Sequence, residues 1–268
     1  MSASTRFRGD VLAFGHVVAA RTTPRPKPDV SRETPANGEH RAGSRKLSQF
    51  RRLTSWPMAR LHLFDLDGTL LHGTSAPLEI SRQLGLEAET VELEQEISAG
   101  LIGPPEYATR VYALWADLKE THVAAAFEGA PWLARIREVW AEIRSAGEYC
   151  AVVSLSPSFF VERLTGWGAH AAHGSLFPAV PFTEASMDLA GVLDAAAKVV
   201  IADRLCEEFG VTRADCVAYG DSMSDKDLFG AVPVSVAVNA DRHLAGLATH
   251  SYAGRDLWDA YELVRGAR

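Results

Sequence analysis

Residues 61–70 read LHLFDLDGTL, and this stretch decides the fold of the chain. The apolar run Leu61–Phe64 has the length and composition of a buried β-strand. It ends directly in two carboxylates, Asp65 and Asp67, and Gly68 then marks a turn. Asp and Gly are common in ordinary solvated turns, so the stretch alone fits a plain turn as well as a site. Because ligands of parallel sheets collect at the carboxyl ends of strands, the junction is a candidate site.

Strands and helices alternate along the rest of the chain. Further strands are expected at Tyr149–Val153, Cys216–Tyr219 and Val234–Val238. Helices are expected at Pro131–Ala146, Ser158–Thr165, Ala195–Phe209, Lys226–Phe229, Asp241–Leu247 and Asp256–Arg265. Strands separated by helices imply right-handed crossovers. The pattern therefore predicts an α/β chain with a doubly wound, mainly parallel sheet.

The interval between the first two strands is too long for one crossover. It has the helical periodicity of three segments, Ala76–Gly85, Glu89–Gly100 and Glu106–Thr121. We expect residues 76–128 to form a small helical cap inserted after the first strand. The catalytic core then consists of residues 58–75 and 129–268.

Residues 1–57 differ in composition from the remainder. They carry 11 Lys and Arg against 4 Asp and Glu, and Pro, Gly, Ser and Thr interrupt them throughout. Such a segment cannot bury enough apolar surface to offset the entropy lost on ordering. We expect a disordered basic extension, with Met58 opening the folded part.

Composition excludes several classes of protein. No apolar stretch approaches the roughly 20 residues that span a bilayer, which argues against an integral membrane protein. Residues 58–268 carry 16 basic and 30 acidic groups, a poor balance for binding nucleic acid. The three cysteines lack the spacing of a zinc site and make no disulfide framework. We expect a cytoplasmic enzyme without a nucleic-acid or membrane partner, and the oligomeric state stays open.

Four further candidate residues follow at three places along the chain. Ser154 comes directly after the second strand, and Lys198 lies among apolar residues of an expected helix. Asp221 and Asp225 follow the strand Cys216–Tyr219. Taken singly, Ser154 fits a helix N-cap and Lys198 fits a solvated helix residue. A buried lysine needs an anionic partner, however, and four such signals after successive strands make coincidence a poor explanation.

With these motifs, the sequence resembles the haloacid dehalogenase (HAD) superfamily. The strings DLDGTL at 65–70 and GDSMSD at 220–225 carry the resemblance, with Ser154 and Lys198 in order between them. The interval from Asp65 to Ser154 is 89 residues, that from Ser154 to Lys198 is 44, and that from Lys198 to Asp221 is 23. Helices inserted directly after the first motif resemble the phosphoserine phosphatase branch of this superfamily.

The resemblance implies catalytic roles for the motif residues. Asp65 would be the nucleophile that attacks phosphorus and forms an aspartyl phosphate. Asp67 would protonate the leaving group and then activate the water that hydrolyses the intermediate. Ser154, Lys198 and Thr69 would bind the phosphoryl oxygens, the electrostatic stabilisation on which phosphoryl transfer depends.

The resemblance also implies Mg²⁺ as the cofactor. Its ligands would be Asp65, Asp221 and the main-chain carbonyl of Asp67, because hard oxygen ligands suit this ion. Asp225 would support Lys198 and the waters on the metal. The expected partner is a small phosphorylated metabolite.

Three functions remain open for a chain with these motifs: a phosphatase, a phosphomutase and a silent binding module. A phosphatase is favoured over a dehalogenase, because the dehalogenases lack an aspartate equivalent to Asp67 and need no acid for a halide. A phosphomutase would use the same aspartyl phosphate and return the phosphoryl group to a sugar. A catalytically silent binding module is the third possibility, and the presence of every motif residue argues against it.

Substrate choice in this branch depends on the cap. Thr74 stands where phosphoserine phosphatases have a glutamate for the substrate ammonium, whereas Arg110 is the counterpart of their carboxylate-binding arginine. The second motif reads SLSP at 154–157 in place of the usual Ser-Gly-Gly. We expect a small, carboxylated phosphomonoester, either phosphoserine or another metabolite.

Overall fold

The computed structural model describes residues 59–266, so the extension expected over residues 1–57 lies outside the described part. Six strands form one sheet in the order β3-β2-β1-β4-β5-β6, and every pair is parallel. The strands are β1 (Leu61–Phe64), β2 (Tyr149–Pro157), β3 (Ala171–Ser175), β4 (Cys216–Gly220), β5 (Val234–Val238) and β6 (His250–Tyr252). The prediction of a doubly wound parallel α/β sheet is confirmed.

The register of the central strands brings the candidate residues to one edge. Phe64, the last residue of β1, pairs with Val152 on β2 and with Tyr219 on β4. Whatever follows these residues therefore emerges at the same carboxyl edge. Asp65 remains anchored there, because its amide donates to the carbonyl of Tyr219 at 2.9 Å.

Helices cover both faces of the sheet and one end of it. The helices are α1 (Ala76–Leu84), α2 (Glu87–Ser98), α3 (Pro104–Leu114), α4 (Glu120–Gly129), α5 (Ile136–Ser145), α6 (Ser158–Val161), α7 (Ala195–Phe209), α8 (Lys226–Ala231), α9 (Arg242–Ala245) and α10 (Leu257–Arg265). Short 3-10 turns occur at Glu162–Trp167, Leu189–Gly191, Arg213–Asp215 and Met223–Asp225. Within residues 59–266, every helix is too short or too polar to cross a bilayer.

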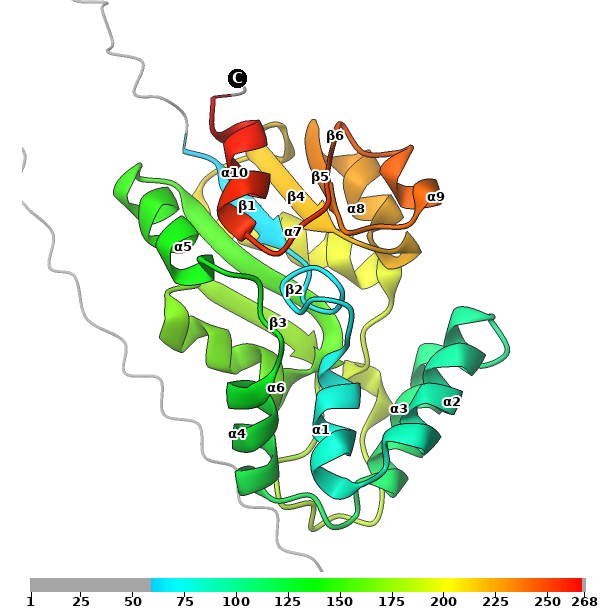
Figure 1. Ribbon diagram of the computed structural model, residues 1–268. Coiled ribbons are helices and arrows are strands. Elements are labelled where there is room, and N and C mark those ends of the chain that lie inside the picture. Colours follow the sequence, from blue (N-terminus) through cyan, green and yellow to red (C-terminus); the bar gives the residue numbers. More distant parts are fainter. Residues whose placement is uncertain (1–58, 267–268) are drawn as a thin grey trace, which may run out of the picture. The chain divides into compact units, whose positions relative to one another are not determined.

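The alternation of side chains along β1 explains the three layers. Leu61 and Leu63 pack with α7 and α8 on one face, whereas Phe64 packs with Trp140 of α5 and Tyr261 of α10 on the other. Successive side chains of a strand point to opposite faces, and β1 is buried on both of them. Figure 1 shows α5 and α10 together on their face of the sheet.

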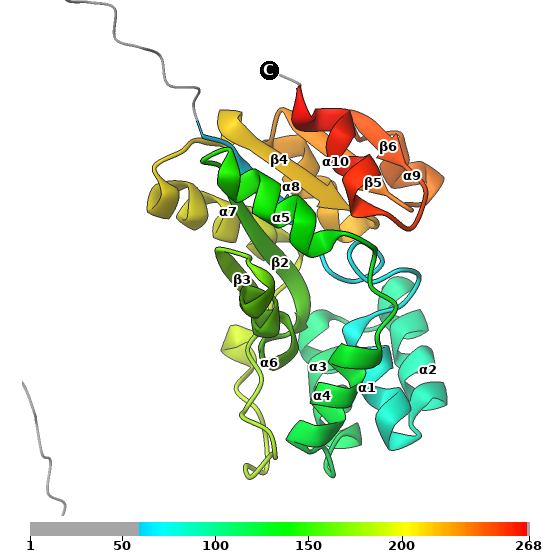
Figure 2. The ribbon, with the colours of Figure 1, turned by 60° about the vertical axis from the view of Figure 1, so that its left-hand side comes forward.

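Four helices, α1 to α4, lie between β1 and β2 in the chain. Figures 1 and 2 show them grouped at one end of the sheet. Ile80, Val111, Trp115 and Val123 bury the inner faces of this group. They belong to one apolar cluster with Phe64 and other residues of the sheet, so the group is anchored to the core by packing.

Three predicted helices have the wrong bounds, and of these Ser158–Thr165 is α-helical only as far as Val161. The predicted helix Glu106–Thr121 is broken, because α3 ends at Leu114 and α4 starts at Glu120. Trp115 is fully buried at the break, and its indole N–H donates to Ser81 Oγ at 2.8 Å. This buried contact ends the helix.

The helix predicted from Pro131 begins only at Ile136. Before it, the amides of Leu133 and Ala134 donate to the carbonyls of Leu70 and Arg255, at 2.9 and 2.8 Å. Tertiary hydrogen bonds thus replace the first helical turns. The short strands β3 and β6 carry no clear sequence signal and were not predicted.

Candidate active site

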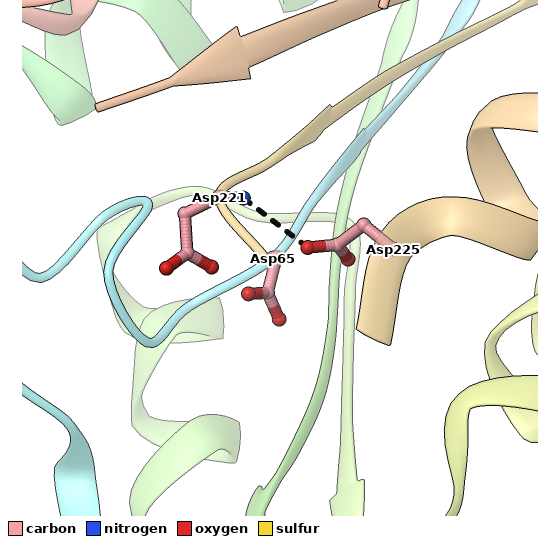
Figure 3. A group of neighbouring side chains, drawn as sticks. All are labelled: Asp65, Asp221 and Asp225. Carbon is pink, nitrogen blue, oxygen red and sulfur yellow. Dashed lines mark hydrogen bonds between the residues drawn. The ribbon is translucent and has the colours of Figure 1, made fainter. Parts of the chain in front are cut away.

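The carboxyl edge of β1 and β4 gathers three aspartates. Asp65 follows β1, Asp221 follows β4, and Asp225 ends the 3-10 turn after it. One oxygen of each carboxylate lies within 4.8 Å of the others, and Figure 3 shows the side chains directed toward a common space. The amide of Asp221 donates to Asp225 Oδ2 at 3.2 Å, which ties the loop together.

Lys198 enters this group from α7. Its ammonium donates to Asp65 Oδ1 and to Asp225 Oδ1, both at 2.7 Å, and its side chain is 1% exposed. Lys198 shares the inner face of α7 with Ile201, Ala202 and Leu205, which is the 3.6-residue spacing of a helix face. The apolar run thus buries the lysine, and the two carboxylates compensate its charge.

The four carboxylates of the site outnumber its one lysine. Burial and repulsion from Asp225 raise the pKa of Asp65 well above its ordinary value, although Lys198 opposes them. The same two causes raise the pKa of Asp221 to about 7. Burial alone would lower the pKa of Lys198, but attraction to Asp225 and Asp65 raises it above the usual range. The excess negative charge suits a divalent cation.

Oxygen donors for such a cation are present. Asp65 and Asp221 offer carboxylate oxygens of the hard type that Mg²⁺ prefers. None of the hydrogen bonds found among residues 59–266 uses the main-chain carbonyl of Asp67. These three groups are the predicted ligands, and the chemistry of the donor set fits the ion.

The turn after β1 is shaped around Asp221. Gly68 has φ of +72°, and a Cβ placed on it would lie 2.0 Å from Asp221 Oδ2. Only glycine meets both demands, because other residues rarely adopt this backbone conformation. The amides of Leu70 and Leu71 both donate to the carbonyl of Leu66 at 2.9 Å, which closes the turn.

We expect Gly68→Ala to lower kcat/KM by about 100-fold, the cost of misplacing a site group by an ångström, since Asp221 must move. Gly85→Ala is the matched control. Gly85, which follows α1, also has positive φ, at +72°, but nothing lies within 4 Å of the position that a Cβ would occupy there, and it lines neither site cavity. Both variants lose stability by about 1–2 kcal/mol in urea unfolding, whereas only Gly68→Ala loses phosphate release. Equal activity of the two variants would contradict this account of the turn.

Asp67 is held by the next strand and by the helical group. Its Oδ1 accepts the amide of Ala76 at 2.7 Å, and its Oδ2 accepts the hydroxyls of Ser156 at 2.6 Å and of Ser154 at 3.3 Å. Burial raises the pKa of Asp67, while the hydrogen bonds from Ser156 and Ala76 oppose the shift. A carboxyl with a raised pKa holds a proton more readily, as a general acid must.

Ser154 does not sit where the sequence predicted. It lies inside β2, which runs on to Pro157, and not at a helix start. Its hydroxyl faces Asp67 and accepts the amide of Ser156 at 3.1 Å. Sequence reasoning missed the stronger contact made by Ser156, although the two serines lie on one side of the strand end at a spacing of two.

Thr69 and Arg110 make no hydrogen bond to the site carboxylates within residues 59–266. The hydroxyl of Thr69 is buried without a hydrogen-bond partner among residues 59–266. Arg110 is exposed on α3, where it pairs with Glu96. Neither residue lines the two cavities that adjoin Asp67, so their predicted contacts with the substrate stay predictions.

Two adjoining cavities meet at Asp67. The first, of about 340 Å³, opens over the carboxylates and is lined by residues that include Asp65, Lys198 and Asp221. The second, of about 220 Å³, runs between α2 and α3 and has mainly apolar walls. Asp67, Ser75, Glu94 and Leu155 line both cavities. The site is therefore a polar chamber that continues into an apolar one.

Glu94 is a site residue that sequence reasoning missed. It lies on α2, accepts a hydrogen bond from the Ser75 hydroxyl, and burial raises its pKa. Thr74, which stands at the position of the family's glutamate, instead donates to Glu79 at 2.6 Å. The sequence of α2 does not distinguish Glu94 from its neighbours, because the helix carries several glutamates along its length.

Comparison with known proteins agrees with the geometry. The family model of the haloacid dehalogenase-like hydrolases matches residues 62–229, which include Asp65, Lys198 and both aspartates after β4. The chain belongs to this family. The predicted resemblance is thereby confirmed.

The relatives of this family member include phosphoserine phosphatases. The chain is 26% identical over 208 residues to that of Methanocaldococcus jannaschii, with 77% of this chain and 98% of the relative covered. It is 24% identical over 199 residues to the phosphoserine phosphatase of Archaeoglobus fulgidus, and the match covers 74% of this chain and 58% of the relative. The chain thus spans little more than half the length of some curated relatives.

Solved structures show the same fold. A phosphoserine phosphatase with bound substrate superposes with a TM-score of 0.67 at 24% identity, covering 76% of this chain and 98% of the other. A phospho-aspartyl intermediate analogue of phosphoserine phosphatase gives a TM-score of 0.65 at 23% identity, covering 77% and 99%. At this identity the likeness concerns the fold alone.

Proposed function

We propose that this chain is a Mg²⁺-dependent phosphomonoester hydrolase that works through an aspartyl phosphate on Asp65. The observation that carries the proposal is the placement of Asp65. Its carboxylate lies 2.7 Å from the Lys198 ammonium, next to Asp221, and it lines the polar chamber. Membership of a hydrolase family and the likeness to phosphoserine phosphatases support the same reaction.

In the first half-reaction, a carboxylate oxygen of Asp65 attacks phosphorus. The bond between phosphorus and the ester oxygen breaks, and Asp67 gives its proton to the leaving oxygen. The raised pKa of Asp67 suits this donation. The hydroxyls of Ser154 and Ser156 hold its carboxyl in place.

In the second half-reaction, Asp67 accepts a proton from water. The water oxygen attacks phosphorus, the acyl phosphate bond breaks, and Asp65 is restored as a carboxylate. Phosphate leaves with the oxygen of that water. Lys198 holds Asp65 in place throughout, and it supplies positive charge to the phosphoryl oxygens.

Mg²⁺ would be held by Asp65, Asp221 and the main-chain carbonyl of Asp67, and it would neutralise the charge of the incoming phosphate. Asp225 supports Lys198, to which it is bonded at 2.7 Å. We also assign Thr69 to the phosphate site, because it belongs to the DLDGTL motif at 65–70 that contains Asp65 and Asp67. The buried hydroxyl of Thr69 has no partner among the described residues and would gain one there.

We further propose the division of the chain into a core, residues 58–75 and 129–268, and a helical cap, residues 76–128. The grouping of α1 to α4 at one end of the sheet supports the cap. A cap over the site shields an aspartyl phosphate from stray water. The three cysteines are free and buried, which fits the reducing cytoplasm that we propose as the compartment.

The leaving group is a small metabolite. The sequence favoured a carboxylated one bound by Arg110, but this arginine is exposed and pairs with Glu96. We expect Arg110→Ala to change kcat/KM by less than about twofold, as is usual for exposed positions away from a site. Steady-state kinetics on phosphoserine and phosphoglycolate measure this. A loss above tenfold on both substrates would restore Arg110 to the substrate site.

Phosphate release by the full chain tests the proposed function. The substrates are p-nitrophenyl phosphate and a panel of small phosphomonoesters, with Mg²⁺ and then with EDTA. Turnover that requires the metal supports the proposal. Transfer of the phosphoryl group within a sugar phosphate, without phosphate release, would replace it by a phosphomutase, and no turnover would favour a silent binding module.

A further inference from the structure

The apolar chamber adjoins Asp67, the proposed acid of the first half-reaction. Asp67 is the acid that protonates the leaving oxygen, and it lines both the polar and the apolar chamber. With the phosphoryl group over Asp65, the rest of the substrate therefore extends past Asp67 into the apolar chamber. This step rests on the function proposed above.

The charged side chains of this chamber are Asp67 and Glu94 alone among its lining residues. No Lys, Arg or His of residues 59–266 forms an ion pair with Glu94. Arg82 attracts it at longer range, but the Arg82 guanidinium is bonded to Glu79 and Glu87. Glu94 is thus a half-buried carboxylate without a cation of its own, which is costly unless a ligand supplies one.

Ser75 holds Glu94 in a fixed orientation. The Ser75 oxygen caps α1 by accepting the amide of Leu78 at 3.1 Å. Its single proton is then directed to Glu94 Oε1. The other oxygen of Glu94 has no hydrogen-bond partner among the described residues and remains available to a ligand.

Tyr107 adds a polar atom to the opposite wall. The Tyr107 hydroxyl makes no hydrogen bond among residues 59–266, and the charges of both Glu94 and Asp67 act on it. A phenol oxygen can accept a hydrogen bond from an ammonium group. The remaining walls are largely apolar and include Pro77, Val111 and Phe177.

We propose that the leaving group carries an ammonium group, which Glu94 and Tyr107 bind, and that it carries no carboxylate. The substrate class is a phosphorylated amino alcohol. A substrate carboxylate would enter a chamber that already holds two acidic side chains and has no basic one, and its desolvation would be uncompensated. The contact of Glu94 replaces the ammonium contact that Thr74 cannot make.

Steady-state kinetics of the full chain with Mg²⁺ test the proposal on three substrates of similar size. These are phosphoethanolamine, its uncharged isostere propyl phosphate, and phosphoglycolate. We expect kcat/KM for phosphoethanolamine to exceed that for propyl phosphate by at least about 30-fold, the scale of a desolvated charge contact. Phosphoglycolate should be the poorest of the three.

Glu94→Gln keeps the size and a hydrogen bond of the side chain and removes its charge. We expect it to lower kcat/KM for phosphoethanolamine by about 30-fold and to leave propyl phosphate within about twofold. Glu92→Gln, an exposed glutamate of the same helix, is the matched control and should change neither. Inhibition by 3-aminopropylphosphonate, compared with butylphosphonate, gives the same preference without turnover.

Equal loss on both substrates in Glu94→Gln would overturn the proposal, because the residue would then act on the fold or the chemistry. So would an equal kcat/KM of the wild type for phosphoethanolamine and propyl phosphate, with Mg²⁺-dependent turnover intact. That result would leave the phosphatase standing. Absence of turnover on every phosphomonoester, p-nitrophenyl phosphate included, would instead overturn the proposed function and this inference with it.

Discussion

Asp65→Asn is expected to lose at least about 10⁴ of the phosphatase kcat, the scale seen when a covalent nucleophile is removed. The amide is a poor nucleophile, yet it keeps the shape of the side chain and an oxygen that can accept from Lys198. The fold should therefore survive, because Lys198 retains Asp225 as its second partner. Phosphate release and the urea unfolding midpoint measure the two effects separately.

The control for this variant is Asp227→Asn. Asp227 is exposed on α8, two residues beyond Asp225, and takes no part in the site. The substitution Asp227→Asn removes the same charge from the same region, and the variant should keep full activity. An Asp65→Asn protein with activity near that of the control would show that another group attacks phosphorus.

Removal of Mg²⁺ should have the second large effect. EDTA is expected to abolish turnover, because the carboxylates of Asp65 and Asp221 would otherwise repel a dianionic substrate. Binding should also stabilise the fold by relieving the repulsion among the buried carboxylates. At an Mg²⁺ concentration about 100 times Kd, the gain is about 2.7 kcal/mol. This corresponds to a rise in Tm of about 5–10 °C for a chain of this size.

The variant Asp221→Asn distinguishes Mg²⁺ binding at the proposed site from a general effect of salt on Tm. The variant replaces a charged oxygen ligand by a neutral amide oxygen, and it removes the repulsion between Asp221 and Asp225. We expect its metal-free form to be at least as stable as the wild type, and its Tm to respond weakly to Mg²⁺. A full Tm rise in Asp221→Asn, or none in the wild type, would contradict the proposed metal site.

The sequence alone was enough to predict the site residues that come directly after strands. Asp65 and Asp221 come directly after apolar strands, and parallel pairing of β1 with β4 brings them to one edge. Lys198 was recognisable because a charge among alanines and valines needs a buried partner. The central sheet and the order of these residues therefore required only local patterns and the rule for parallel crossovers.

The cap could not be predicted in the same way. Glu94 and Arg110 both lie on helices with several charged residues, and only tertiary packing decides that Glu94 lines the chamber while Arg110 faces Glu96. The break between α3 and α4 depends on the buried contact of Trp115 with Ser81, which no periodicity reveals. Ser156 was overlooked because β2 continues past the residue at which its apolar run ends.

The central claim is that Asp65 carries the phosphoryl group during turnover. Rapid acid quench of the enzyme with substrate and Mg²⁺, followed by peptide mass spectrometry, measures this directly. We predict a phosphorylated peptide that contains Asp65, that is sensitive to hydroxylamine as an acyl phosphate should be, and that is absent from Asp65→Asn. Turnover with the label on another residue, or with no label at any quench time under conditions that saturate the enzyme, would contradict the account.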